Sequence, residues 1–160
     1  MESAAEVSRP SIYIDMSIRQ VIGVVIVGLT AGVVSWGLAA VIDQYILHGM
    51  LCQTMMTPQC QAVPSYSRSA AMLIAGLAAV FTLVQLQVFR PLLVAIGVVA
   101  SLWGLGALIG SQPMFAEAGI YAGAFTLAYL AFTWIARLRS FWVSFVLMVA
   151  LVAAVRFLLN

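Results

Sequence analysis

Charged positions are rare in this chain and divide it into long apolar segments. The segment from Val21 to Ile42 holds twenty-two residues without a charge, and Asp43 follows it directly. A helix needs about 20 apolar residues to cross the hydrocarbon core of a bilayer. The segment therefore predicts a membrane-spanning helix. Because it is longer than the apolar part of a cleaved signal peptide, about 7–15 residues, we expect it to be retained.

The same pattern recurs four times further along the chain, with prolines and polar residues at the breaks. Pro91 suits the first position of a helix, and all five prolines are expected at helix ends or in loops. Asp15 is a candidate N-cap of the first helix, and Ser67 or Ser69 can cap the second. The predicted helices span residues 16–47, 69–89, 91–110, 115–136 and 141–160, and one long polar loop lies at 48–68.

Composition assigns the whole chain to the membrane. Of its 160 residues, 64% are hydrophobic and only 8% are charged, and the mean hydropathy is +1.12. A soluble domain has about 25% charged residues, so this chain has too few to cover a water-facing surface. We expect an all-α integral membrane protein, a single domain over residues 1–160 that forms a bundle of five transmembrane helices. The net charge of +2 without a basic run gives no reason to expect nucleic acid as a partner.

The placement of arginine predicts the orientation. Cytoplasmic loops of membrane proteins carry an excess of basic residues. With the N-terminus inside, only Arg68 and Arg156 lie outside. We therefore expect the N-terminus in the cytoplasm, the C-terminus outside, and a location in a bacterial plasma (inner) membrane. The arginines then predicted inside are Arg9, Arg19, Arg90, Arg137 and Arg139.

Both cysteines, Cys52 and Cys60, fall in the loop predicted to lie outside. In an oxidising compartment such a pair most simply forms a disulfide. Redox chemistry is the alternative, but it typically uses a Cys-x-x-Cys pair with a lowered thiol pKa, and here seven residues separate the cysteines. Free thiols are the third possibility.

Few ionisable groups lie near the predicted outer face. Asp43, His48 and Glu117 could bind a metal ion or relay protons, but their spacing is not a ligand signature, and the plainer interpretation is that they are solvated or cap helix ends. Arg156 either extends to the outer headgroups or forms a salt bridge with Asp43 or Glu117. Trp36 and Trp103, nearer mid-membrane, either pack in the core or line a lipid or quinone cleft. We expect no metal site and no cofactor.

Small residues four apart recur in the predicted spans. Such spacing lets helix backbones approach closely, which favours association where the hydrophobic effect does not operate. The contacts are expected mainly within the chain, although contacts between subunits would use the same residues. The pairs are Gly28 with Gly32, Gly106 with Gly110, and Gly119 with Gly123.

Three functions are consistent with this sequence. The first is a non-catalytic accessory or scaffold subunit of a membrane complex, because no nucleophile–base pair, metal cluster or phosphate loop is visible. Its partners would be the lipid bilayer and other membrane subunits or further copies of itself. The second is a small oligomeric transporter or channel that uses Asp43 or Glu117, although intramembrane charge is scarce. The third is a membrane enzyme acting on lipid or quinone, for which only His48 and the carboxylates offer reactive groups.

Overall fold

Every regular element of the described chain is a helix. The computed structural model describes residues 17–47, 49, 58–109, 112–138 and 140–159, and this part of the chain contains no β-strand. The all-helical expectation is therefore confirmed. Five of the helices have twelve residues or more within these ranges.

The first helix, α1, spans Ile18–Val41 and continues as a π-helical segment, η1, over Ile42–Leu47. The predicted range was 16–47. The N-cap is Ser17 rather than Asp15, because the Ser17 hydroxyl accepts from the Gln20 amide while the Gln20 side chain accepts from the Ser17 amide. This reciprocal pair satisfies two backbone donors that a helix start leaves free.

The second long helix, α3, spans Pro58–Gln85 and begins eleven residues before the predicted start of 69. Ser67 and Ser69 do not cap it. Their hydroxyls donate to the carbonyls of Pro64 and Ser65, at 3.1 and 2.9 Å, from inside the helix. Pro64 also lies within the helix and not in a loop. A segment rich in serine and proline resembles a loop in sequence, although serine can bond to the preceding turn of a helix.

The predicted helix 91–110 is wrong as a single element. It divides into α4, Pro91–Leu102, and the short α5, Leu105–Ile109. Gly104 separates them with a φ of +94°, which L residues rarely adopt. Glycine in place of a stronger helix former weakens the segment, and the chain breaks there.

The last two helices start and end close to the predicted residues. Helix α6 spans Met114–Ala136, where 115–136 was expected, and α7 spans Phe141–Leu159, where 141–160 was expected. Pro113 precedes α6 in extended backbone, so the break predicted at that proline coincides with the helix start.

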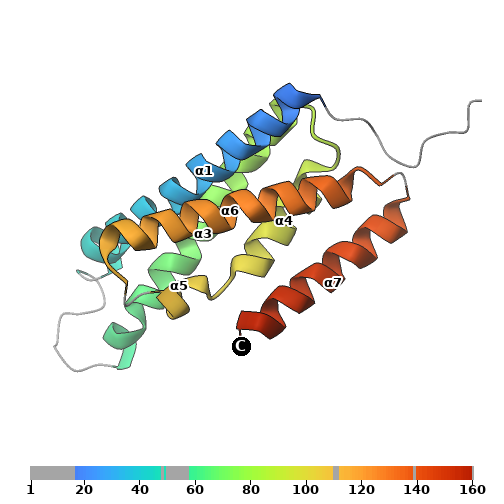
Figure 1. Cartoon of the computed structure of the whole chain (residues 1–160). Coiled ribbons are helices and arrows are strands. Elements are labelled where there is room, and N and C mark those ends of the chain that lie inside the picture. Colours follow the sequence, from blue (N-terminus) through green and yellow to red (C-terminus); the bar gives the residue numbers. More distant parts are fainter. Residues whose placement is uncertain (1–16, 48, 50–57, 110–111, 139, 160) are drawn as a thin grey trace, which may run out of the picture.

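The helices pack as an antiparallel bundle (Figure 1). Helix α1 packs along both α6 and α3, and α4 packs on α3 and α6. Helix α7 lies at the edge, where it contacts mainly α4 and, to a smaller extent, α6. The end of α1, the early part of α3 and the start of α6 meet at one end of the bundle (Figure 1).

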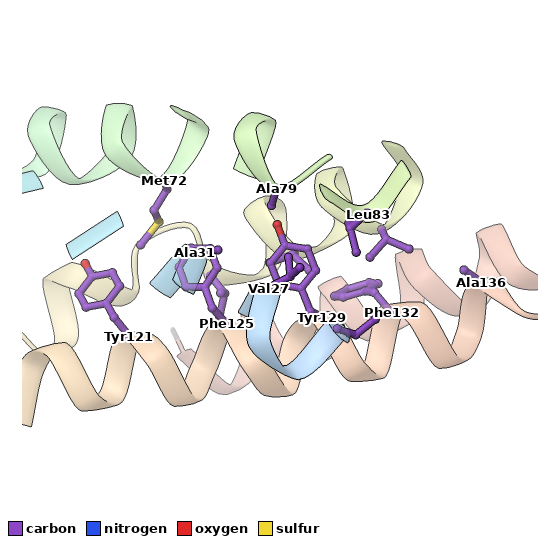
Figure 2. Packing of buried hydrophobic residues seen from close by; sticks show 14 of the residues in the cluster. Val27, Ala31, Met72, Ala79, Leu83, Tyr121, Phe125, Tyr129, Phe132 and Ala136 are labelled. Carbon is purple, nitrogen blue, oxygen red and sulfur yellow. The ribbon is translucent and has the colours of Figure 1, made fainter. Parts of the chain in front are cut away.

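An aromatic row on α6 forms the centre of the core. The spacings of four, four and three residues place these side chains on one helical face, and each is at most 1% exposed. Figure 2 shows them pointing toward Met72, Ala79 and Leu83 of α3. The row comprises Tyr121, Phe125, Tyr129 and Phe132.

Three helical segments are long and apolar enough to cross a membrane. They are Ile18–Leu47, Ala62–Gln85 and Met114–Ala136. Two further apolar helices are shorter, Pro91–Leu102 and the described part Phe141–Phe157. The structure therefore supports association with a membrane through at least three helices.

Candidate functional site

Polar side chains from three helices meet in one pocket at the end of the bundle. Asp43 lies in η1, Arg68 lies in the first half of α3, and Glu117 lies in the first turn of α6. These residues are far apart in sequence. They meet because α3 and α6 both run antiparallel to α1, so that their early turns lie beside the end of α1 (Figure 1). The pocket has a volume of about 160 Å³, and its lining residues are Trp36, Ala39, Ala40, Asp43, Ser67, Arg68, Glu117 and Tyr121.

Arg68 holds the centre of this arrangement through two contacts. Its Nη2 lies 3.4 Å from Glu117 Oε1, and its Nη1 donates to the Gly106 carbonyl at 2.8 Å. The two side chains of the ion pair are only 26% and 17% exposed. Because partial burial reduces screening by solvent, this ion pair contributes more to stability than a fully exposed one.

Gly106 makes room for the arginine. A Cβ atom at this position would collide with Arg68 Cδ and would lie 2.6 Å from the Tyr121 hydroxyl oxygen. The absence of a side chain in α5 therefore allows Arg68 to reach the Gly106 carbonyl. The sequence predicted a packing role for Gly106 with Gly110, and Gly110 lies outside the described residues.

Tyr121 contributes a buried phenol to the pocket. The residue is 1% exposed, and its hydroxyl has no hydrogen-bond partner among the described residues. Burial removes water without replacing its hydrogen bonds. The hydroxyls of Ser35, Tyr129 and Thr133 are also buried without a partner among the described residues, but of these four only Tyr121 lines the pocket. The aromatic row of α6 positions the ring, and this polar atom remains unsatisfied at the pocket.

Asp43 occupies the π-helical segment that extends α1. Its side chain is half-buried, and no hydrogen bond or ion pair joins it to another residue in the part of the chain that the structure describes. Single π-helical turns often occur at functional sites. The pocket therefore contains one paired carboxylate, Glu117, and one unpaired carboxylate, Asp43.

The lining suits binding more than covalent chemistry. It offers two carboxylates, one guanidinium, one phenol and the Ser67 hydroxyl, which donates to the Pro64 carbonyl. No histidine or cysteine is among the described lining residues. The described residues also contain no group of three or more His, Cys, Asp or Glu side chains that could hold a metal ion.

Arg156 lies apart from this pocket. Its Nη1 donates to the Trp103 carbonyl at 2.7 Å, and the side chain is exposed. The ion pair of Glu117 is with Arg68 instead. Arg156 thus satisfies a backbone carbonyl at the break between α4 and α5, where no helical hydrogen bond is available to it.

The predicted packing glycines fall into two groups. Gly28 and Gly32 lie at the closest approach of α1 to α6, where an added Cβ would be 2.5 Å from the Cα atoms of Thr126 and Ala122, respectively. By contrast, an added Cβ at Gly119 or Gly123 would meet nothing within 4 Å. The second pair therefore leaves small open positions on α6.

Besides Gly110, three predicted site residues lie wholly or partly outside the described structure. His48 and Cys52 are not described, and neither is the side chain of Cys60. The disulfide between Cys52 and Cys60 therefore stays a prediction.

Sequence reasoning missed Arg68 and Tyr121 as members of the site. Arg68 was noted only for its predicted position outside. Its proximity to an apolar segment, on the same predicted side as Asp43 and Glu117, was the available signal. Tyr121 carried no comparable signal, because an aromatic residue at helical spacing usually belongs to a core.

The fold and the pocket define an all-helical bundle with a polar pocket at one end and at least three helices suited to a membrane. Comparisons with known proteins find no matching family model, no similar curated protein and no similar solved structure.

Proposed function

We propose that this chain is a polytopic inner-membrane protein whose five long helices all enter the bilayer. Many large apolar side chains face outward, including Leu77, Phe81 and Leu127, each about 70% exposed. Several hydroxyl side chains lie inside instead, among them Ser35 and Thr133. An apolar exterior with a few hydroxyl side chains inside suits a lipid environment, where exposed apolar surface carries no hydrophobic cost.

The shorter helices fit this proposal in different ways. Helix α7 has 19 residues and a length of about 28 Å, close to the hydrocarbon thickness. Helix α4 has 12 residues, so α5 would complete the crossing beyond the break. Five crossings place the termini on opposite sides, with the N-terminus in the cytoplasm as the arginine distribution favours.

Within that membrane setting, the proposed role is that of a non-catalytic accessory or scaffold subunit. One observation carries this role: the buried row Phe125, Tyr129 and Phe132 fills the middle of the bundle. Tyr121, the first member of the same aromatic row, lines the polar pocket, and the buried rings that follow it fill the bundle along α6. The pocket lining also lacks a nucleophile paired with a histidine base, so contacts made by the helix faces are the function that remains.

The role is tested by extracting the full chain from its native membrane into lipid nanodiscs and measuring its mass in the intact state. A scaffold subunit should be recovered with another chain at a fixed stoichiometry that persists after dilution. Recovery as a monomer alone would contradict the proposal. Recovery as a homo-oligomer would favour the second candidate.

The second candidate is an oligomeric transporter or channel. The pocket favours it because Asp43 and Glu117, which the sequence proposed for this role, line the same cavity. The aromatic row closes the single bundle, so a transport path would need a second copy. Flux into proteoliposomes that disappears in Asp43→Asn but persists in Asp15→Asn would support this candidate.

A further inference from the structure

The polar pocket has an excess of negative charge. Two carboxylates, Asp43 and Glu117, face one guanidinium, that of Arg68. Arg68 is committed to Glu117 at 3.4 Å and to the Gly106 carbonyl at 2.8 Å. The charge of Arg68 is therefore largely compensated by Glu117, and Asp43 has no ion-pair partner among the described residues.

A buried phenol adds an unused hydrogen-bonding group to this charge. The Tyr121 hydroxyl is buried, lines the pocket and has no partner among the described residues. Unmade hydrogen bonds of buried groups are costly. The phenol and the Asp43 carboxylate line the same pocket. A ligand with several hydrogen-bond donors that fills this pocket would bond to both.

The remaining walls of the pocket indicate the kind of cation. Trp36 supplies an aromatic side chain, and Ala39 and Ala40 leave space beside Asp43. Aromatic rings attract organic ammonium ions through their negative faces. A divalent metal ion prefers more oxygen ligands than one unpaired carboxylate and a phenol provide, and an anion would meet two carboxylates.

We infer that this pocket binds the ammonium group of an amine, with Asp43 as the counter-ion, Tyr121 as a hydrogen-bond acceptor and Trp36 as an aromatic wall. The ammonium group could belong to a lipid headgroup or to a small soluble amine. This inference concerns the same pocket as the second candidate function, the transporter or channel, but it does not require transport. Binding is measured without transport, so that absence of flux in proteoliposomes would count against the transporter and leave the binding result unchanged.

The test uses the full chain in nanodiscs of phosphatidylglycerol, with ethanolamine as the soluble probe and calorimetry as the readout. Ethanolamine should bind, and inorganic phosphate should bind more weakly or not at all. Asp43→Asn should weaken ethanolamine binding about tenfold or more, because it removes a charge-assisted contact. Trp36→Leu should weaken it about threefold to tenfold, and Trp36→Phe should restore part of the loss.

Matched variants separate the pocket from general effects. Asp15→Asn removes the same charge at a residue that precedes the opposite end of α1. Trp142→Leu removes an indole that is 73% exposed in the first turn of α7. Both should bind ethanolamine as the unmodified chain does. If Asp43→Asn fails to fold, the comparison of Trp36→Leu with Trp142→Leu still decides the question.

A second set of nanodiscs separates the two sources of the ammonium group. These discs contain phosphatidylethanolamine and phosphatidylglycerol in equal amounts, and intact mass spectrometry measures the lipid retained. Selective retention of phosphatidylethanolamine that Asp43→Asn abolishes assigns the site to a lipid headgroup. Ethanolamine binding without lipid selectivity assigns it to a soluble amine. Binding of neither, ethanolamine binding unaffected by Asp43→Asn, or tighter binding of phosphate would overturn the inference.

Discussion

The absence of a Cβ atom at Gly106 determines how Arg68 and Tyr121 are placed in the polar pocket. Arg68 reaches across from α3 only because Gly106 has no side chain, and Tyr121 fits beside both. The guanidinium then contacts a carboxylate and a backbone carbonyl together. In a bundle with so few charges, this network depends on a glycine that composition alone would assign to helix packing.

At this residue scale we predict that Gly106→Ala destabilises the protein. The new methyl group would collide with Arg68 and the Tyr121 hydroxyl, and insertion of a methyl into a packed site costs about 1–3 kcal/mol of unfolding free energy. Thermal unfolding in nanodiscs measures the loss. Gly119→Ala is the control, since its Cβ would meet nothing within 4 Å, and it should be neutral or stabilising by up to about 1 kcal/mol. Equal stability of the two variants would contradict the prediction.

The elements pack closely where glycine lets two backbones approach. Gly28 and Gly32 on α1 face Thr126 and Ala122 on α6, four residues apart on each helix. Such spacing places successive close contacts along one line of the helix surface. The contact between α1 and α6 aligns Asp43 with Glu117 at one end of the bundle.

For this helix pair we predict that Gly32→Ala lowers the unfolding free energy by about 3 kcal/mol, near the upper end of overpacking effects. The added Cβ would lie 2.5 Å from the Ala122 Cα and 2.7 Å from the Tyr121 carbonyl, and backbone atoms cannot rotate away. Gly37→Ala, in the same helix with nothing within 4 Å, should instead stabilise by about 0.5–1 kcal/mol. Chemical denaturation in mild detergent compares the two variants. A Gly32→Ala variant as stable as Gly37→Ala would show that the helices do not approach this closely.

The broken helix supports a second prediction at the scale of elements. Arg156 of α7 donates to the Trp103 carbonyl at the break, so Arg156→Ala should loosen residues 103–109. One lost hydrogen bond, about 1–1.5 kcal/mol, corresponds to about tenfold faster amide exchange there. Hydrogen-exchange mass spectrometry measures it, with Arg156→Lys as a variant that keeps a donor and should be affected less. Unchanged exchange over 103–109 would mean that the arginine does not hold the break.

The whole molecule combines a closed aromatic core with an apolar exterior and one polar end. The packed row from Phe125 to Phe132 fills the middle of the bundle. The carboxylate of Asp43 gives the polar end the inferred preference for an ammonium group. Because the helices alternate in direction, the pocket and the C-terminal end of α7 lie toward the same end of the bundle (Figure 1). The proposed orientation therefore places both at the outer face.

For the whole molecule we predict that alkaline phosphatase fused after Asn160 is active, since that enzyme requires the oxidising outer compartment. Phosphatase fused after Arg139, at the predicted inner turn between α6 and α7, should be inactive. Activity measured in intact cells distinguishes the two fusions. The reverse pattern would invert the orientation, and activity of both or neither would show that α7 does not cross the membrane.

The amino-acid pattern alone determined that the described chain is helical and that at least three of its segments suit a bilayer, because apolar length and the positions of Pro91 and Pro113 are local properties. It placed α6 within one residue at its start and α1 with η1 within two. It could not reveal the start of α3 at Pro58 or the break at Gly104, since a serine- and proline-rich segment and a lone glycine are each compatible with two backbone conformations. The site required tertiary structure: Asp43, Arg68, Glu117 and Tyr121 come from three helices, and only their packing registers bring one surplus carboxylate and one unpaired phenol into the same pocket.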